Sequence, residues 1–273
     1  MKRGIFFILL CLFAFTNCKQ IPNERIPQYM PEVKTSVSGD SLIIFLGNPI
    51  AAPLQFLASS LYDVVQDFLI DAFPVVVNGF ADTTLVFVSD GFPESPRIRF
   101  NSLLGNPNLP FTPPVLELPF PRGKTYEVIQ GYYGSFSHNS DFSRYALDFN
   151  TAVGDTITAA AHGYVVGVVD GYKHGGNNRK WMDFANFITL YHPEFNVFTQ
   201  YVHLVHNGSL VALGDTVVAG QPVALSGNTG FSSGPHLHFN VLRPMHKEVI
   251  STPVASIGNY KGEELVRGFI VRN

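Results

Sequence analysis

The sequence predicts a mainly β protein composed of two units. Short apolar runs at residues 41–46, 73–77 and 84–88 alternate with turn residues, a pattern typical of short strands. The same pattern continues, strand after strand, through the second half of the chain. There the turn sequence Gly-Asp-Thr occurs twice between apolar residues, at 154–156 and 214–216. This repeat indicates two related hairpins in one sheet.

Residues 1–18 are predicted to be a lipoprotein-type signal peptide. Lys2 and Arg3 precede an apolar run over residues 4–15, which is far shorter than the roughly 20 residues of a membrane-spanning helix. The run ends in Ala-Phe-Thr-Asn-Cys, which resembles a bacterial signal whose cysteine, here Cys18, becomes the acylated first residue of the mature chain. The alternative is an ordinary signal peptide cut nearby, with the cysteine incidental.

Cysteine content and charge limit the classes of protein. Cys11 lies within the signal, so a processed chain would retain only Cys18 and form no internal disulfide. An apolar core must then hold the fold, and 46% hydrophobic residues with a mean hydropathy of +0.14 make this feasible. The formal net charge is −3. Without clusters of Lys and Arg, we expect no nucleic-acid partner.

The next two segments are predicted to be a tether and an accessory domain. Residues 19–39 are polar and contain three prolines, as in an extended linker. Residues 40–118 are expected to form a small β-sandwich-like domain, with a helix over 54–70 where apolar residues recur at near-helical spacing. This unit contains no histidine. Its expected role is spacing, substrate positioning or regulation. A proline-rich junction over 106–121 separates it from the second unit.

The second unit, residues 119–250, contains the motifs that indicate chemistry. In Ser-Gly-Pro-His-Leu-His-Phe, alternation along a strand would place His236 and His238 on one face. His203 ends another alternating apolar run in Tyr-Val-His-Leu, and Asp148 adds a carboxylate in Tyr-Ala-Leu-Asp-Phe. Zinc hydrolases typically use three protein ligands and a water, with His and carboxylate as suitable donors. The pattern therefore predicts a zinc centre.

These motifs resemble those of the lysostaphin/LytM-type zinc endopeptidases of bacterial cell walls, over residues 121–245. The resemblance implies an antiparallel-sheet catalytic domain of the duplicated hybrid motif type and Zn²⁺ as the cofactor. By position in the motifs, it implies the following roles: Asp148 and His238 as zinc ligands, and His203 and His236 as the catalytic pair. The other histidines match no motif ligand position and are expected to be core or surface residues: His162, His174, His192, His206 and His246.

The remaining zinc ligand departs from the family pattern. The usual spacing places a histidine four residues before the aspartate, and Arg144 stands there. The nearest candidate is His138, ten residues before Asp148, as in a family variant with a longer loop. A loop insertion can preserve ligand geometry when ordered strands hold both of its ends. A pairing of His138 with Asp141 is the lesser alternative, because Asp148 lies inside the motif match.

The expected chemistry follows from the ligand charges. Two neutral imidazoles and one carboxylate leave a zinc site with net positive charge, which lowers the pKa of bound water and polarises a scissile carbonyl. The catalytic pair would orient the water, accept its proton or stabilise the oxyanion. The sequence does not divide these roles between the two histidines. The glycine-rich residues 171–178 are predicted to form one wall of the cleft, and residues 251–273 a C-terminal tail.

The resemblance implies a zinc-dependent endopeptidase that hydrolyses peptide cross-links of peptidoglycan. We expect an envelope protein that is membrane-anchored through Cys18 and faces the periplasm or the cell surface. Its expected partners are peptidoglycan peptides and cell-division or wall-remodelling proteins. One alternative is a catalytically silent cell-wall-binding module or amidase activator, although such relatives usually lack site residues that this chain has. Another is a surface lipoprotein that binds host or matrix proteins. The export signal is the only sequence feature that supports this alternative.

Overall fold

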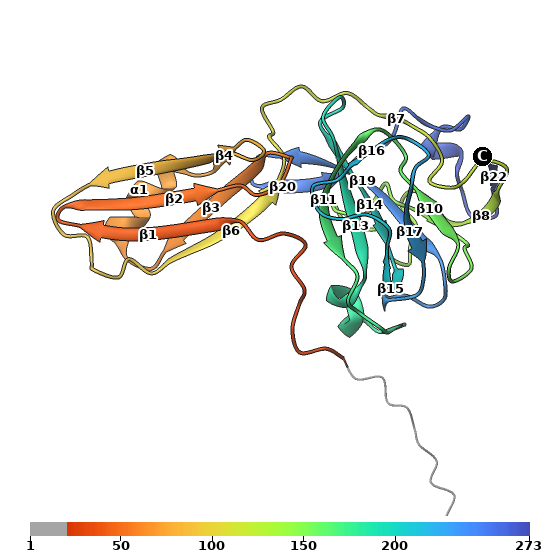
Figure 1. Ribbon diagram of the computed structural model, residues 1–273, viewed down its shortest axis with the longest axis horizontal. Helices are drawn as coiled ribbons and strands as arrows, with labels where there is room; N and C mark the ends of the chain where they lie inside the picture. Colours follow the sequence, from red (N-terminus) through yellow and green to blue (C-terminus); the bar gives the residue numbers. More distant parts are fainter. Residues whose placement is uncertain (1–20) are drawn as a thin grey trace, which may run out of the picture.

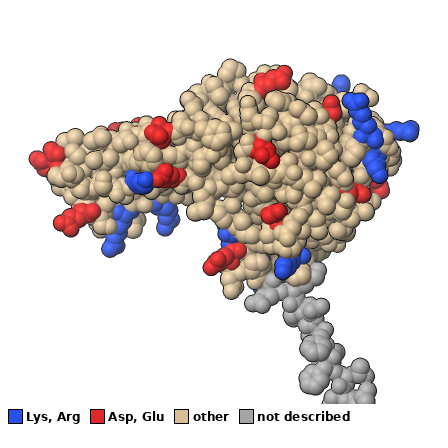
Figure 2. Space-filling view, in the orientation of Figure 1, with Lys and Arg blue, Asp and Glu red and all other residues tan. Residues whose placement is uncertain are grey.

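The computed structural model describes residues 21–273, so the predicted signal peptide and Cys18 lie outside the described residues. An elongated N-terminal unit adjoins a larger second unit (Figure 1). Both units are built mainly from antiparallel strands, which confirms the predicted fold class. Over residues 21–273, no helix is both long enough and apolar enough to cross a bilayer. Charged side chains form separate groups on a largely uncharged visible face (Figure 2).

The N-terminal unit is a sandwich of two small sheets. In the described residues, one sheet has the order β1 (Glu32–Ser38), β2 (Ser41–Gly47), β5 (Asp82–Val88), and the other has the order β4 (Val75–Val77), β3 (Leu54–Ser60), β6 (Ile98–Leu104). Alternate residues of β2, namely Leu42, Ile44 and Leu46, are fully buried between the sheets. Helix α1 (Asp63–Ala72) buries Val65 and Leu69. This arrangement agrees with the β-sandwich expected for the unit.

Two elements of this unit differ from expectation. Residues 32–38, predicted to belong to the tether, form β1 and pair in register with β2. The helix begins at Asp63, because residues 54–60 form β3 between β4 and β6. Leu54, Gln55 and Phe56 are all fully buried, so both faces of β3 are covered. Periodicity cannot distinguish such a strand from a buried helical segment.

The second unit contains one large antiparallel sheet and one small sheet. Within residues 21–273, the large sheet has the order β16 (Thr216–Val217), β11 (Gly163–Val169), β13 (Phe187–His192), β14 (Val197–Val202), β19 (Leu237–Met245), β9 (Leu147–Phe149), β8 (Thr125–Gln130), β22 (Ile270–Arg272), with β20 (Glu248–Ser251) also paired to β19. The small sheet has the order β10 (Thr156–Thr158), β17 (Pro222–Ser226), β15 (Leu204–Ser209). Phe149, Tyr201 and Phe239 belong to the core of this unit.

Short elements complete the second unit. They are β7 (Val115–Leu116), paired in parallel with β21 (Ser256–Ile257), β12 (Gly175–Gly176), paired in parallel with β18 (Gly230–Phe231), and the 3₁₀ helices η1 (Arg179–Phe184) and η2 (Gly262–Glu264). The predicted C-terminal tail is therefore ordered. Its last strand, β22, pairs with β8 and buries Val271, so it belongs to the large sheet.

The repeated Gly-Asp-Thr sequence forms the same turn twice. Gly154 and Gly214 have φ angles of 91° and 93°, in the left-handed region that glycine adopts without steric cost. One residue later, Asp155 and Asp215 each accept a hydrogen bond from a backbone N–H three residues earlier, at 2.9 and 2.8 Å. The strands that follow lie in different sheets, since β10 pairs with β17 and β16 with β11. The prediction of a repeated turn is confirmed, and the placement of both hairpins in one sheet was wrong.

The two units share an apolar cluster. Val166, Tyr191, Phe198 and Leu242 from the second unit are buried in the same cluster as the core of the N-terminal unit. The buried Gln55 adds a hydrogen bond across the boundary, donating from Nε2 to the Met245 carbonyl at 2.9 Å. Burial of apolar surface is the main source of such association. The sheet that carries the motif residues is thus packed against the first unit.

Candidate metal centre and active site

Strand pairing brings Asp148 and His238 together. In the antiparallel pairing of β9 with β19, Asp148 lies opposite His238, and on the other side of β19 His238 lies opposite Val202. Paired residues on one face of a sheet have their Cβ atoms about 5 Å apart. This pairing places His238 Nδ1 2.8 Å from Asp148 Oδ1.

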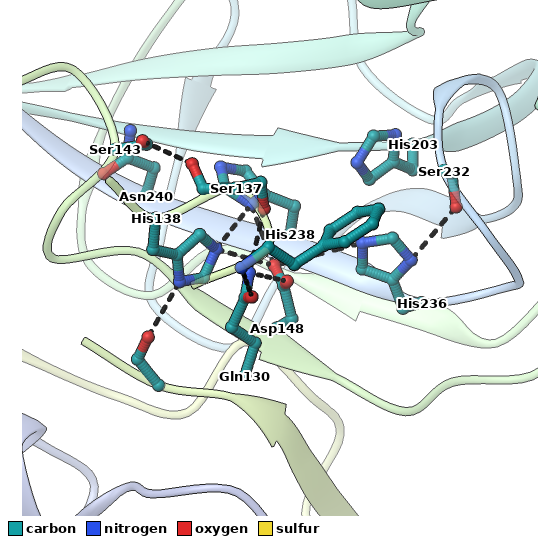
Figure 3. A network of polar contacts seen from close by, with 12 residues as sticks. Gln130, Ser137, His138, Ser143, Asp148, His203, Ser232, His236, His238 and Asn240 are labelled. Atoms are coloured by element: carbon teal, nitrogen blue, oxygen red, sulfur yellow. Dashed lines mark hydrogen bonds and ion pairs between the residues drawn. The ribbon is translucent and has the colours of Figure 1, made fainter. Parts of the chain in front are cut away.

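His138 reaches the same place from the loop between β8 and β9. Its side chain is fully buried, and its Nδ1 donates to the Gly131 carbonyl at 2.8 Å. The other nitrogen, Nε2, lies 3.2 Å from Asp148 Oδ1 and 3.3 Å from His238 Nδ1 (Figure 3). The structure thus brings together all three predicted metal ligands. Asp141, the alternative partner, instead pairs with Arg144, and its side chain is 68% exposed.

The three side chains fit a zinc ion in distance and in chemistry. Their donor atoms all lie within 4.8 Å of one another. Zinc in a tetrahedral site has bonds of about 2.0–2.1 Å to nitrogen and oxygen, which places ligand atoms about 3.3 Å apart. The separations of 2.8 to 3.3 Å found here are close to that value. Two imidazoles and a carboxylate are also a typical donor set for catalytic zinc.

The electrostatics of the cluster favour an ionised carboxylate. Burial raises the pKa of Asp148, but hydrogen bonds and charges from His138 and His238 outweigh burial and hold the pKa well below its usual range. Burial also lowers the pKa of His238, and this effect exceeds the opposing influence of Asp148. A charged carboxylate beside a neutral imidazole is the state in which both groups can bind a metal ion.

His203 and His236 lie beside this cluster with their ring centroids 4.5 Å apart. His203 Nδ1 donates to the Thr229 carbonyl at 2.7 Å, and His236 Nδ1 donates to the Gly234 carbonyl at 2.9 Å. These bonds leave Nε2 of each ring free, and His236 Nε2 lies 3.9 Å from Asp148 Oδ1. Burial, assisted by the charges of His236 and His238, lowers the pKa of His203 to about 3. His203 is therefore neutral at pH 7 and able to accept a proton.

A cleft of about 1160 Å³ leads to these side chains. Asp148, His203, His236 and His238 line it, while His138 lies beneath its surface. At its edge the rings of Phe136 and Phe231 stack, with centroids 5.3 Å apart and an interplanar angle of 17°. These rings come from the β8–β9 loop and from β18, so they connect two walls of the cleft.

One wall was predicted wrongly. The glycine-rich residues 171–178 do not line this cleft, and some of them line a smaller neighbouring pocket of about 540 Å³. Gly175 and Gly176 pair with β18, which holds that loop away from the cleft. The wall on this side contains Met182 and Asp183 from η1.

The N-terminal segment, residues 22–29, also contributes to the cleft and is docked, in contrast to the predicted tether. The Ile26 N–H donates to the Tyr172 hydroxyl at 2.6 Å, and Arg25 forms an ion pair with Asp183 at 2.5 Å. A Cβ atom at Gly171 would lie 2.6 Å from Ile26 Cδ1, so the segment uses the space that glycine leaves. Arg25 and Ile26 line the cleft. No sequence motif signals this docking, which depends on residues about 150 positions away.

Sequence comparison places the second unit in a known family. Residues 143–251 match the profile of peptidase family M23. These residues thus form a peptidase family M23 domain. The match includes Asp148, His203, His236 and His238, but it begins five residues after His138. The proposal that His138 is a ligand therefore depends on the contacts described above.

Curated relatives of this chain include proteases. The chain is 36% identical over 129 residues to an uncharacterized metalloprotease of Haemophilus influenzae, covering 46% of this chain and 24% of that protein. It is 31% identical over 112 residues to the peptidoglycan DD-endopeptidase ShyA of Vibrio cholerae, covering 40% and 23%. The match thus spans about a quarter of the length of these relatives. Among solved structures, the catalytic domain of the antimicrobial peptidase lysostaphin from Staphylococcus simulans is 24% identical, with a TM-score of 0.33 and coverage of 47% and 87%.

Proposed function

We propose that this protein, through its M23 domain, is a zinc-dependent endopeptidase that hydrolyses peptide cross-links of peptidoglycan in the bacterial cell envelope. The principal support is the convergence of His138, Asp148 and His238 within 3.3 Å contacts at the base of the cleft. The substrate class is supported by the relatives in Vibrio cholerae that are named peptidoglycan DD-endopeptidases.

The proposed ligands and the catalytic pair have separate tasks. His138 Nε2, His238 Nδ1 and Asp148 Oδ1 would hold the ion, which would act as a Lewis acid on the scissile carbonyl and lower the pKa of water. His203 and His236 present their Nε2 atoms beside this centre. These nitrogens would accept the proton of the attacking water and donate a hydrogen bond to the developing oxyanion. The carbonyls of Thr229 and Gly234 hold the Nδ1–H tautomer, in which Nε2 is able to accept a proton. After taking up that proton, Nε2 can donate to the oxyanion.

The cleft has room for a peptide rather than only a small molecule. Its volume of about 1160 Å³ slightly exceeds the roughly 300–1,000 Å³ usual for small-molecule sites. Its lining combines aromatic rings at the edge with the polar side chains of the candidate metal centre. The catalytically silent alternative is not favoured, because the complete set of five side chains is assembled.

Metal analysis combined with a peptidoglycan hydrolysis assay tests this proposal. The wild-type protein should contain one zinc per chain and clear purified peptidoglycan. His238→Ala should lose both zinc and hydrolysis, whereas His236→Ala should retain zinc and lose hydrolysis. His246→Ala is a matched control, because His246 is exposed and lies in the turn between β19 and β20. Metal-free wild-type protein that binds peptidoglycan without cutting it would instead identify a binding module.

Attachment to a membrane through an acylated Cys18 is a separate proposal, motivated by the signal-like sequence of residues 1–18. Cys18→Ser should shift the protein from the membrane fraction to the soluble fraction of cells. Unchanged partitioning would reject acylation and leave the proposed peptidase activity unaffected.

A further inference from the structure

The side chain of Gln130 connects both parts of the candidate metal centre. Gln130 is the last residue of β8, directly before the loop that carries His138. Its Nε2 donates to Asp148 Oδ2 at 2.9 Å and to Ser137 Oγ at 2.8 Å, and its Oε1 accepts from the Phe136 N–H at 3.1 Å. Because a backbone N–H can only donate, the contact with Phe136 fixes which end of the amide faces Asp148. Gln130 therefore binds the loop and the carboxylate at the same time (Figure 3).

The contact with Gln130 gives the two carboxylate oxygens of Asp148 different partners. Oδ2 accepts from Gln130, and Oδ1 faces the nitrogens of His138 and His238. A register shift between Val128 and Gln130 occurs where β8 pairs with β9. Such irregularities redirect side chains beside functional sites. Gln130 thus orients Asp148 with one oxygen toward both imidazoles.

The contacts with the loop address the unusual spacing of the ligands. His138 lies ten residues before Asp148, and ordering each residue of the intervening loop costs backbone entropy. Gln130 holds Phe136 and Ser137, the two residues directly before His138. Within the loop, Ser143 Oγ donates to the Ser137 carbonyl at 2.8 Å. Gln130 is thus the member of this network that also contacts the metal-binding carboxylate.

Gly134 leaves the space in which the Gln130 side chain lies. A Cβ atom at Gly134 would lie 2.2 Å from Gln130 Cγ and 2.6 Å from its Cδ. Such distances require one group to move. A methyl group at residue 134 would therefore displace Gln130 while leaving the amide chemically intact, which offers an independent means of testing its role.

We propose that Gln130 is a positioning residue for zinc binding, which couples Asp148 to the loop that carries His138. This inference rests on the proposed zinc site. Groups that hydrogen-bond metal ligands typically contribute 10–100-fold to metal affinity. This coupling would hold His138 and Asp148 in place at the zinc site, although ten residues separate them along the chain.

Zinc affinity, measured by competition with a chromophoric chelator, tests the proposal. Gln130→Ala should weaken binding about 10–100-fold. Gln130→Glu should also weaken it, because glutamate retains an acceptor for the Phe136 N–H but lacks the donor to Asp148. Gly134→Ala should weaken it through displacement of Gln130. Gln221→Ala is the matched control: Gln221 Oε1 accepts from the Val218 N–H at 3.1 Å in a turn that does not line the cleft, so zinc affinity should stay unchanged.

Thermal unfolding of the metal-free proteins separates positioning from general stability. We expect the metal-free variants to unfold within a few degrees of the wild type and to gain less stability from added zinc. Wild-type zinc affinity in Gln130→Ala, or an equal loss of stability with and without zinc, would overturn the inference. A wild-type protein that binds no zinc would overturn the proposed function as well, so the two failures are distinguishable.

Discussion

His238 lies directly opposite Asp148 in an antiparallel strand pair, with its Nδ1 2.8 Å from the carboxylate. This relationship depends on the register of β19, because a shift by one residue would turn His238 to the other face of the sheet. Phe239, the next residue, is 1% exposed and packs against Tyr201 with ring centroids 5.4 Å apart. Packing behind the strand therefore fixes the face on which the proposed metal ligands meet.

Asp148→Asn should reduce zinc affinity by more than about 100-fold, because it removes the negative charge of the donor set. Loss of a group that only hydrogen-bonds a metal ligand typically reduces the affinity by about 10–100-fold. Zinc affinity from chelator competition measures this loss. Asp141→Asn is the control, since Asp141 pairs with Arg144 at the surface. Reduced zinc affinity in Asp141→Asn, with normal affinity in Asp148→Asn, would show that Asp148 is not the ligand.

His203→Ala should lower kcat by about 10²–10⁴-fold, the usual contribution of a general acid or base. Zinc content should remain at the wild-type level, because the His203 ring contacts His236 and His238 without belonging to the ligand cluster. Zinc analysis and steady-state kinetics on the same sample test both statements. Loss of zinc in this variant would place His203 among the ligands.

Acid should destabilise the fold through His192. Burial lowers the pKa of this histidine from 6.5 to about 4, and it is fully buried, with Nδ1 donating to the His162 carbonyl at 2.8 Å. Above pH 6.5 the imidazole is neutral in both the folded and the unfolded chain. Between pH 6.5 and about 4 only the unfolded chain binds the proton, so the free energy of unfolding decreases as pH falls. The decrease should total about 3 kcal/mol.

Urea unfolding of metal-free protein at several pH values measures this decrease. His192→Gln lacks the titrating group, so its free energy of unfolding should depend less on pH across this window. The stability difference between wild type and variant should therefore shrink as the solution is acidified. A difference that stays constant from pH 7 to pH 4 would contradict the assignment to His192.

The docked N-terminal segment should slow trypsin cleavage after Arg25. Tyr172→Phe removes the hydroxyl that accepts from the Ile26 N–H at 2.6 Å and donates to the Glu24 carbonyl at the longer distance of 3.5 Å. Loss of the shorter hydrogen bond alone costs about 1 kcal/mol, which corresponds to about a fivefold increase in the cleavage rate. Cleavage after Arg267 serves as an internal reference, because this exposed residue precedes Gly268 far along the chain. Equal rates after Arg25 in both proteins would indicate that the segment is not held through Tyr172.

The sequence predicted the parts of the site that depend on local periodicity. Alternation along one strand placed His236 and His238 on the same face, and the motif around Asp148 indicated the opposing carboxylate. His138 was proposed from the resemblance to a family variant with a longer loop, because Arg144 stands at the usual position. Its contact with Asp148 required the structure of the whole loop.

Long-range contacts account for what the sequence did not predict. Gln130 looks like an ordinary polar residue at the end of a strand until Asp148 and Phe136 are placed beside it. The N-terminal segment is polar and proline-containing, as a free linker would be, yet Tyr172 and Asp183 hold it. In β3, burial of both faces removed the alternation that distinguishes strands from helices.

The apolar cluster shared by the two units determines how the molecule can be divided. Val166, Tyr191, Phe198 and Leu242 would be exposed to water if the peptidase unit were separated from its neighbour. Fully burying each such side chain is worth about 1.5–3 kcal/mol, a large fraction of the stability of an ordinary domain. Removal of the N-terminal sandwich would therefore leave an aggregation-prone, poorly soluble second unit, and transplanting the candidate site into another protein requires carrying the sandwich with it.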